Sequence, residues 1–562
     1  MPYTPPLRDF AFILDQVVGF DQVRESDRFG DATPDTVQAI LSEGGRLCAE
    51  VIAPLRRPGD VTPTRLENGA VVSPPGYADG FRALADGGWI GMAAAPEFGG
   101  MGMPQTVSTA FYEMMASACL SLQMNPLLTQ GQIEALEHHA SDEIKALYLP
   151  KLISGEWSGT MNLTEPQAGT DLAALRSKAE AQADGSYNIS GQKIYISWGD
   201  CDFTENVCHL VLARLPDAPA GSKGISLFLV PKVIPNPDGS LGQPNRLRVV
   251  SLEHKLGIHG SPTCVMEYEG ATGWLVGAPH KGLAAMFTMM NNARVGVGVQ
   301  GIGVAEGAYQ HALAYAQDRK QGPTPKGTTA IIDHPDIRRQ LAIMRAEVFA
   351  ARAIAMANCV AIDMATATGG ADWPARAGFL TPITKAHGTE LGITVSDMGI
   401  QIHGGMGFIE ETGAAQFLRD VRVTAIYEGT NAIQALDLVG RKLGDGGKAA
   451  FALLDEMSAT AAASEMGAPV ADAVQALRAA TEWMLEQDMQ GRAAGATAYL
   501  RAFARVLGAD MHLRAAASED ATRKALARVY IDHLLPEHAA HLAAMRADPA
   551  AYMDLAPEGM TA

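Results

Sequence analysis

The hydrophobic periodicity of this chain changes twice along its length, and this order of patterns limits the possible folds more than any other feature. Apolar residues follow helical spacing from Ala11 to about Ser154. From about Gly155 to Val276 they form short runs separated by Asp-Gly turns, a pattern typical of an antiparallel β domain. From about Gly282 the helical spacing returns. The sequence therefore predicts an all-helical first third, a β domain and then a helical bundle.

Four long periodic segments predict the helices of the bundle, at residues 283–320, 336–367, 384–401 and 431–443. The glycine-rich residues 444–447 indicate a linker, and an Ala-rich helical tail follows them. We therefore predict a mainly α protein with a central β domain, divided into an N-terminal helical domain (1–157), a middle β domain (158–278), a four-helix bundle (279–445) and an extra helical C-terminal domain (446–562).

Charge and cysteine usage exclude several classes of function. The chain has 44 Lys and Arg against 62 Asp and Glu, a net charge of −18, which disfavours a nucleic-acid partner. Its 6 cysteines form no Cys-x-x-Cys pair, so we expect reduced thiols, not disulfides or a zinc site. The N-terminal residues lack a signal-peptide pattern, and the most lipid-like stretch, 295–308, is interrupted by Gln300 and Glu306. We therefore expect a cytoplasmic protein without a membrane segment.

A glycine motif in the bundle region imitates a nucleotide-binding fingerprint. Gly296-x-Gly298-x-x-Gly301 matches the dinucleotide pattern, and Asp318 follows at a suitable distance. That fold needs a strand before the glycines, whereas residues 286–294 already show helical spacing. Small residues within a helix let a second helix approach closely. We therefore interpret these glycines as packing residues and not as an NAD site.

A hydroxyl-bearing loop lies where the helical pattern gives way to the β domain. Residues 161–171, MNLTEPQAGTD, offer hydroxyls and backbone N–H groups to an anionic or heteroaromatic ligand, although the same residue types are common in ordinary turns. In the strand 193–198, Tyr195 and Ser197 are two positions apart and therefore share one face. That face is suited to covering a flat ring.

Residues 401–408, QIHGGMGF, end a predicted helix in glycines. This pattern is typical of a left-handed C-cap, and it also lets a ligand approach the main chain. His403 fits a buried, hydrogen-bonded histidine better than a metal ligand, because no second histidine or carboxylate stands at metal spacing. We predict no metal site.

The sharpest local feature is residues 426–434, IYEGTNAIQ. Thr430 or Asn431 can cap the following helix, which leaves Glu428 on irregular backbone just ahead of it. Desolvation would raise the pKa of this carboxyl and the positive helix end would lower it. Glu428 is thus either a general base held on a rigid support or a surface acid near a helix start.

Taken in order, these segments resemble the acyl-CoA dehydrogenase family of flavoenzymes. The resemblance covers about residues 35–443 and depends on the conjunction of MNLTEPQAGTDL, GQKIYISWG, DRKQG, QIHGGMGF and IYEGTNAIQ. In length and in TEPQAGTDL, KGISLFLVPK and GIHGSPTCVMEY the chain is most similar to the branch that includes 3-methylthiopropanoyl-CoA dehydrogenase, a branch associated with dimethylsulfoniopropionate catabolism.

The resemblance implies a helical domain, a β-barrel-like middle domain and a four-helix bundle. It implies that Glu428 is the catalytic base, which takes the α-proton of an acyl-CoA thioester while the β-hydrogen leaves as hydride to flavin N5. The thioester carbonyl would be polarised by the Glu428 backbone N–H and a flavin ribityl hydroxyl.

The resemblance also implies which residues contact the cofactor and the substrate. FAD contacts fall on Met161, Leu163, Thr164, Gly169, Thr170, Tyr195, Ser197, Arg319, Gln401, Gly404, Gly405 and Thr430, of which Arg319, Gln401 and Gly405 would reach the FAD of a neighbouring subunit. Acyl-CoA contacts fall on Thr170, Asn291, Arg294, Glu428 and Gly429. The chain departs from the family pattern at Met161, where an aromatic residue is frequent, and at the inserted residues 322–327, which alter the adenine end of the expected site.

Three interpretations remain open at this stage. The first is a homodimeric dehydrogenase that forms a trans-2-enoyl-CoA and passes electrons to an electron-transferring flavoprotein. The second is a relative with other chemistry, either an acyl-CoA oxidase or an alkylation-response protein; the net charge disfavours binding of DNA by the latter. The third is a non-catalytic protein whose helical tail is an interaction surface.

Overall fold

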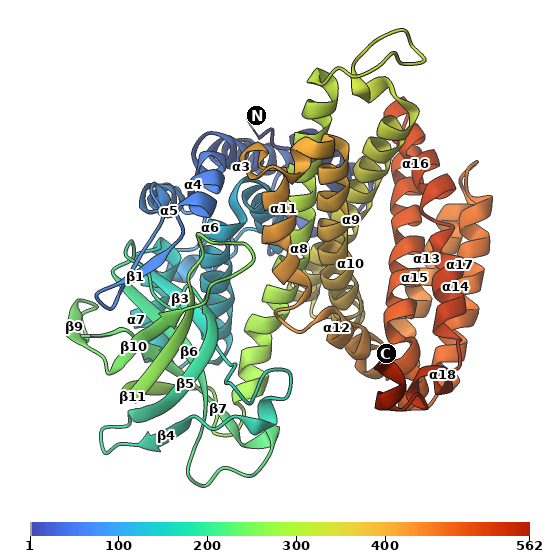
Figure 1. Cartoon of the computed structure of the whole chain (residues 1–562). Helices are drawn as coiled ribbons and strands as arrows, with labels where there is room; N and C mark the ends of the chain where they lie inside the picture. The colour runs from blue at the N-terminus through green and yellow to red at the C-terminus, as the bar shows by residue number, and fades with distance from the viewer. Residues whose placement is uncertain (1–2, 562) are drawn as a thin grey trace. The chain divides into compact units, whose positions relative to one another are not determined.

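The computed structural model describes residues 3–561 and forms two compact units. One unit holds residues 31–296, and the other holds residues 6–30 together with 297–561. The division falls within the long helix α8, Gly282–Asp318 (Figure 1). The expected division into four domains at residues 157, 278 and 445 stays a prediction.

The helices of the 31–296 unit precede its sheet. In α3 the side chain of Thr33 accepts a hydrogen bond from the backbone N–H of Thr36, and Pro34 occupies the first helical position, so both start signals operate. The longest of the helices that precede the sheet, α6, is buried along most of its length and is bent at Cys119, where φ is −157° and ψ is 94°. The helices are α3 (Pro34–Leu47), α4 (Arg56–Val61), α5 (Tyr77–Asp86), α6 (Gln105–His139) and α7 (Asp142–Ser154).

The prediction of an all-helical first third is wrong at one place. Strands β1 (Arg65–Glu67) and β2 (Ala70–Val72) form an antiparallel hairpin. Its two turn residues are Asn68 and Gly69, with φ of 50° and 81°. Asn-Gly is a strong hairpin signal because both residues adopt left-handed backbone easily, so local turn chemistry overrides the helical surroundings here.

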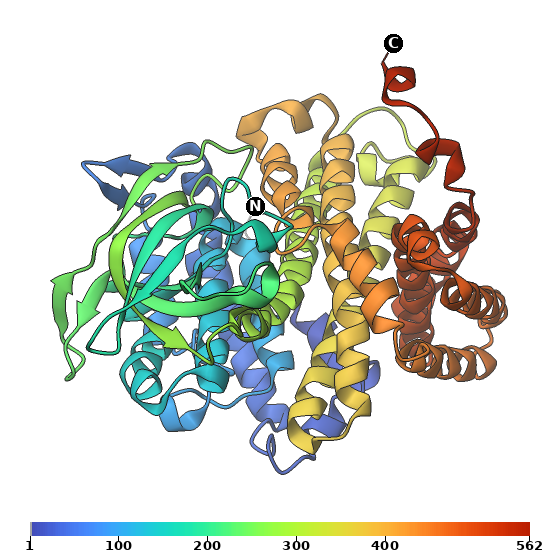
Figure 2. The ribbon, with the colours of Figure 1, turned by 90° about the horizontal axis from the view of Figure 1, so that it is seen from below.

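The middle of the chain forms a seven-stranded sheet that closes on itself. Strand β7 pairs with both β11 and β6, while β11, β5, β4 and β6 follow one another in the sheet, so the strands curve into a barrel-like ring (Figure 2). The strands are β3 (Trp157–Asn162), β4 (Lys178–Ala181), β5 (Tyr187–Ser197), β6 (Asn206–Arg214), β7 (Ile225–Pro231), β10 (Leu247–Leu252) and β11 (Thr263–Val276), with a separate hairpin of β8 (Val233–Pro235) and β9 (Leu241–Pro244).

The expectation of a purely antiparallel sheet is wrong at β6, which pairs in parallel with β3 and also, at Lys178 opposite Arg214, with β4. Strand β3 pairs with β6 in parallel, from Trp157 opposite Asn206 to Asn162 opposite Val211. The reason is topological, because the chain passes through β4 and β5 before it returns beside β3 as β6, and both strands then run in the same direction. The core of this region is a cluster of buried residues from the seven-stranded sheet, joined by one residue of β2: Val71, Ala179, Ile189, Ile196, Val211, Ala213, Phe228, Val230, Val249, Cys264, Met266, Tyr268 and Ala271.

The other unit contains the predicted bundle. Its helices are the second part of α8, α9 (Pro335–Thr368), α10 (Asp372–His403) and α12 (Asn431–Asp437), which continues as a π turn over Leu438–Lys442. Helix α10 begins at Asp372 and not at residue 384, because Pro382 lies inside the helix without ending it. A short helix that the periodicity did not predict, α11 (Ala414–Val421), precedes the Glu428 turn.

Helix α9 is long and apolar enough to cross a membrane by length and composition alone. Its most apolar window has a mean hydropathy of 1.5, yet 83% of that window is buried inside the protein. It is therefore a core helix of the bundle.

The glycines of the Gly-x-Gly-x-x-Gly motif are packing residues inside α8, as predicted: Gly296 faces Leu127 of α6, and Gly298 and Gly301 pack against α10. A Cβ atom on Gly298 would stand 2.5 Å from the carbonyl oxygen of Thr384, and one on Gly301 would stand 2.2 Å from that of Gly388. Gly399 of α10 lies beside Ala308 of α8, so the two helices run in the same direction. These glycines let two backbones meet, and they do not form a nucleotide loop.

The tail after residue 447 is helical and packs on the bundle within the same unit (Figure 1). Phe503 of the tail meets Phe379 of α10 edge to face at 5.0 Å, and His512 lies 5.0 Å from Phe349 of α9. The tail helices are α13 (Lys448–Ala462), α14 (Ala468–Glu486), α15 (Met489–Ala516), α16 (Ala521–His533), α17 (Glu537–Met545) and α18 (Ala550–Met553).

A buried ion cluster joins the tail to the N-terminal helix α1 (Leu7–Gln16), which α2 (Asp21–Arg24) follows, and to the bundle. The Asp9 carboxylate lies 2.9 Å from Arg352 and 2.8 Å from Arg523 of α16, and it also pairs with Arg345. Arg352 reaches Glu306 of α8 at 2.8 Å. Burial alone raises the pKa of Asp9, but the three arginines lower it to about 2.

All six cysteines are buried and free, in agreement with the expectation of reduced thiols.

Candidate functional site

The hydroxyl-bearing loop follows the end of β3, and a buried ion pair between Glu165 and Lys193 fixes its shape. The Glu165 carboxylate accepts hydrogen bonds from the backbone N–H groups of Arg176 and Ser177 at 2.7 and 3.0 Å and from the Ser177 hydroxyl at 2.6 Å. Lys193 of β5 reaches the same carboxylate at 2.9 Å and donates to the Leu163 carbonyl at 3.0 Å. The loop therefore has a fixed shape between residues 163 and 177.

Glu165 and Lys193, the pair that fixes the shape of this loop, were not singled out from the sequence. Lys193 is fully buried and Glu165 is 3% exposed. Burial by itself raises the pKa of Glu165, but the Lys193 ammonium and the surrounding donors lower it to about 2, so the carboxylate stays charged. The strand pattern carried no signal for the burial of Lys193, because alternation places Lys193 on the face of Tyr195 and Ser197. The extra residue that β5 contains between Lys193 and Ile196 puts Lys193 on the buried face with Ile196 instead.

Tyr195 and Ser197 lie on a β-bulge of β5. The pairing with β11 shifts between Lys193 opposite Met266 and Ile196 opposite Cys264, which leaves one extra residue in β5. Tyr195 has φ of 60° and its side chain is 62% exposed, whereas Ile196 is buried. Tyr195 and Ser197 therefore both lie away from the buried face. The hydrogen bond of 3.0 Å from the Ile194 N–H to the Thr164 carbonyl brings this bulge beside the loop.

The remaining predicted residues of this unit lie at the end of β3, on the loop after it or on α8, and they differ in burial. Gly169 and Thr170 are exposed, and no atom would meet a Cβ on Gly169 within 4 Å. Asn291 is exposed on α8, while Arg294 one turn later is buried, with its guanidinium 5.8 Å from the ring centre of Phe287. Met161, Leu163 and Thr164 are half-buried.

In the other unit, Glu428 stands on a strained turn just before α12, as the sequence predicted. Its φ is 56° and that of Gly429 is 81°, so two successive residues are left-handed. Left-handed backbone is uncommon for a residue with a side chain and clusters at functional sites. Thr430 caps α12 by accepting a hydrogen bond from the Ile433 N–H at 3.4 Å, and Gln434 donates to the Glu428 carbonyl at 3.2 Å.

The other predicted FAD residues of this unit are some distance from the Glu428 turn along the bundle. They are Gln401, Gly404, Gly405 and Arg319. Gln401, Gly404 and Gly405 are exposed at the C-terminal end of α10, and Arg319 is exposed just past the end of α8. Because α8 and α10 run in the same direction, these ends belong to the same end of the bundle. Gln401 is twelve residues beyond Thr389, which packs near the Glu428 turn, so the two groups are about 18 Å apart along α10.

The end of α10 differs in detail from a left-handed cap. Gly404 has φ of 60° but ψ of −139°, a combination that only glycine adopts readily. His403 is 4% exposed, hydrogen bonds through Nδ1 to the Gly399 carbonyl at 2.7 Å and stacks on Tyr315 at 4.3 Å. It is a buried histidine, as interpreted from the sequence.

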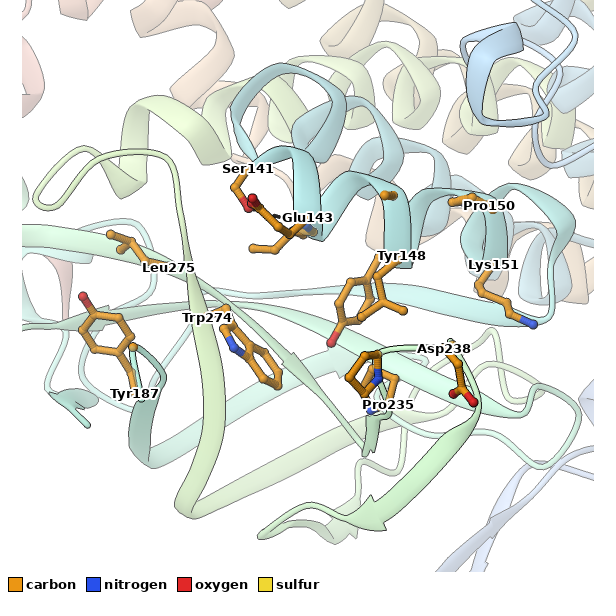
Figure 3. A pocket seen from close by; sticks show the side chains of 16 residues that line it. Ser141, Glu143, Tyr148, Pro150, Lys151, Tyr187, Pro235, Asp238, Trp274 and Leu275 are labelled. Atoms are coloured by element: carbon orange, nitrogen blue, oxygen red, sulfur yellow. Dashed lines mark hydrogen bonds between the residues drawn. The ribbon is translucent and has the colours of Figure 1, made fainter. Parts of the chain in front are cut away.

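A surface groove of about 960 Å³ lies elsewhere in the 31–296 unit, between α7 and the edge of the barrel (Figure 3). Aromatic and proline side chains form much of its wall, including Tyr148, Tyr187, Pro235 and Trp274. The predicted FAD and acyl-CoA residues do not line it.

Comparison with known proteins decides the family. Models of the N-terminal, middle and C-terminal domains of acyl-CoA dehydrogenases match residues 37–156, 160–271 and 280–443. A 3-methylmercaptopropionyl-CoA dehydrogenase of Ruegeria pomeroyi is 47% identical over 89% of this chain and 88% of its own. The chain belongs to the acyl-CoA dehydrogenase family. A second member of the family, a butyryl-CoA dehydrogenase of Syntrophomonas wolfei, is 34% identical over 78% of this chain and 75% of its own.

Solved structures of this family share the fold, including the tail. The Caenorhabditis elegans protein ACDH-11, solved with C11-CoA, has a TM-score of 0.78 at 20% identity, over 94% of this chain and 92% of its own. A Bacillus anthracis acyl-CoA dehydrogenase, solved with FAD, has a TM-score of 0.73 at 20% identity, over 95% and 91%. A model described as acetyl-CoA dehydrogenase C-terminal like matches residues 453–556, so the tail is a recurring part of such chains.

Proposed function

We propose that this chain is an FAD-dependent dehydrogenase that converts an acyl-CoA thioester to the trans-2-enoyl-CoA. The structural observation that carries the proposal is the left-handed turn that presents Glu428 ahead of α12. Family membership and the 47% identical relative favour 3-methylthiopropanoyl-CoA, or another short acyl-CoA, as the substrate.

The loop and bulge of the 31–296 unit fit a flavin. Leu163, Thr164 and Ser197 supply an apolar contact and two hydroxyls around a bulge from which Tyr195 projects with 62% of its side chain exposed. Such an exposed aromatic side chain is suited to cover a planar ring. The open space around Gly169 lets backbone N–H groups approach a phosphate. Met161, Thr170 and Thr430 complete the FAD contacts that we propose within one subunit.

The chemistry of the proposed reaction divides between the protein and the cofactor. Bound FAD supplies the acceptor for the hydrogen that leaves Cβ as hydride. The Glu428 carboxylate removes the proton from Cα, and its backbone N–H donates a hydrogen bond to the thioester carbonyl, which acidifies that proton. Arg294, Asn291, Gly429 and Thr170 bind the acyl-CoA. The reaction requires the base and the acceptor to act on opposite sides of the same Cα–Cβ bond.

We further propose a cytoplasmic homodimer that passes its electrons to an electron-transferring flavoprotein. Arg319, Gln401 and Gly405 support the dimer, because they are exposed at the ends of α8 and α10, and Gln401 lies about 18 Å along α10 from Thr389 beside the Glu428 turn. We propose that these exposed residues contact the FAD of a second copy of the chain.

The proposal is tested with purified protein and a panel of straight-chain acyl-CoAs together with 3-methylthiopropanoyl-CoA. We expect a flavin absorption spectrum that bleaches under anaerobic conditions with short chains or with the thioether substrate, formation of enoyl-CoA, and little peroxide in air. Turnover of long chains alone would contradict the substrate assignment. Stoichiometric peroxide would identify an oxidase, and a protein that binds no flavin would contradict the activity itself.

A further inference from the structure

The backbone of the Glu428 turn needs support from its surroundings. Glu428 and Gly429 are both left-handed, with φ of 56° and 81°. A side-chain-bearing residue stays in this region only where neighbouring groups enforce it. The contacts of the turn therefore identify the residues that fix the direction of the Glu428 carboxylate.

Two glutamines hold the first part of the turn. The side-chain amide of Gln434, fully buried in α12, donates to the carbonyls of Glu428 and Gly429 at 3.2 and 3.4 Å. The hydroxyl of Tyr427 donates to the side-chain carbonyl of Gln300, which is fully buried in α8. The residues on both sides of the Glu428 Cα are thereby tied to buried groups.

A lysine of α10 holds the second part of the turn. The Nζ of Lys385 donates to the side-chain oxygen of Asn431 at 2.9 Å. The side-chain nitrogen of Asn431 donates to the Thr389 hydroxyl at 3.1 Å and to the Ala386 carbonyl at 3.3 Å. Lys385 is fully buried. Burying an ammonium group is costly, so its presence at this point calls for a role that an apolar side chain cannot fill.

The close packing of α8 and α10 brings Gln300 of α8 and Lys385 of α10 to the same height along the bundle. A Cβ on Gly298 would stand 3.0 Å from the Cα of Lys385, and one on Gly301 would stand 2.7 Å from the Cα of Thr389. Gln300 lies between these two glycines in α8. The glycine motif therefore lets two helices converge where they carry the residues that hold the turn.

We infer that Lys385 is a positioning residue for the reaction, which acts through Asn431 to hold the turn that aims the Glu428 carboxylate, together with Gln300 and Gln434. The inference rests on the proposed function, because Lys385 affects the reaction only through Glu428.

The test compares Lys385→Met and Glu428→Gln with the wild-type holoenzyme. Flavin bleaching is followed anaerobically with butyryl-CoA or 3-methylthiopropanoyl-CoA, whichever reduces the wild-type flavin faster, and with the same substrate deuterated at Cα. For Lys385→Met we expect a fall of about 10- to 100-fold in the bleaching rate per bound FAD, since small misplacement of a reacting group has effects of this size. We also expect a larger deuterium isotope effect, with FAD content and Tm close to those of the wild type.

Two further variants separate positioning from folding. Asn431→Ala removes the hydrogen bond between Lys385 and Asn431 while it keeps the lysine, and it should lower the bleaching rate per FAD similarly. The double variant that combines Lys385→Met with Asn431→Ala should be no slower than the slower single variant. Asn358→Ala is the matched control, because this buried amide of α9 donates at 3.3 Å to Thr381 and Thr384 of α10, in the turn that ends at Lys385. It should change Tm but not the rate per FAD.

The outcomes distinguish the inference from the proposal beneath it. If Glu428→Gln abolishes bleaching while Lys385→Met and Asn431→Ala keep the wild-type rate per FAD and isotope effect, the inference is overturned and the proposed base stands. An equal fall in Asn358→Ala would also overturn it, because it would indicate a general packing effect. If Glu428→Gln itself bleaches normally, the proposed function fails first.

Discussion

At the scale of single residues, the buried pair of Glu165 and Lys193 explains how an irregular loop keeps one shape. Five donors converge on the Glu165 carboxylate, from the side chains of Gln167, Ser177 and Lys193 and from the backbone of Arg176 and Ser177. Their effect outweighs desolvation and lowers the pKa of Glu165 to about 2. Because the folded-state pKa lies below the ordinary value of 4.5, the carboxylate contributes stability above about pH 4.5 that is lost as the pH falls towards 2.

The lowered pKa of Glu165 leads to a prediction for the stability of the variant Glu165→Gln. The variant should lose about 3–5 kcal/mol of unfolding free energy at neutral pH, because Lys193 is left buried without a charged partner. Its unfolding free energy should also fall less steeply than that of the wild type between about pH 4.5 and pH 3. Urea unfolding at several pH values measures both effects. Glu180→Gln, an exposed change on β4 of the same sheet, should alter neither; an equal loss there would contradict the account.

The Glu428 turn shows how much of the candidate site could be predicted from the sequence at this scale. Glu428 and its cap Thr430 follow from spacing alone, because the cap and the helix it begins are adjacent in the chain. The residues that hold Glu428 do not, because Gln300 and Lys385 are 128 and 43 positions away and meet the turn only through packing of α8 and α10. Gly298 and Gly301 signalled that a helix approaches α8, but not which helix.

At the scale of elements, the order of helices and strands was predictable and three details were not. The Asn68-Gly69 hairpin carried a recognisable signal that the surrounding helical periodicity obscured. The helix predicted from residue 384 begins at Asp372, because Pro382 is accommodated inside α10. The parallel pairing of β3 with β6 depends on the path of the chain between them, which strand periodicity does not encode.

The ion cluster around Asp9 leads to a prediction about how elements are joined. Asp9 of α1 neutralises arginines from α9 and α16 and is 3% exposed. Asp9→Asn should lower the unfolding free energy by about 3–5 kcal/mol, because it leaves these arginines buried without that charge. The matched change Asp21→Asn removes an exposed pair with Arg24 and should cost less than about 1 kcal/mol. Chemical denaturation of the two variants measures the difference, and equal losses would contradict a structural role for the cluster.

At the scale of the whole molecule, the proposed dimer gives Arg319 a function that one subunit does not explain. Light scattering should give twice the chain mass of 59.3 kDa. Arg319→Ala should keep that mass but release FAD more readily, by about tenfold in Kd, because it removes a charged contact to the cofactor of the partner. Flavin retention after gel filtration measures this. A monomer that holds FAD fully would contradict the cross-subunit contact.

The bleaching rate of Glu428→Gln tests the central claim most directly. Glutamine keeps the size of the side chain and removes only its ability to accept the α-proton, so the turn and the FAD contacts should persist. The account predicts a protein with its full complement of FAD whose anaerobic reduction by the acyl-CoA substrate is slower by about 10²- to 10⁴-fold. A yellow Glu428→Gln protein that bleaches at the wild-type rate would contradict it.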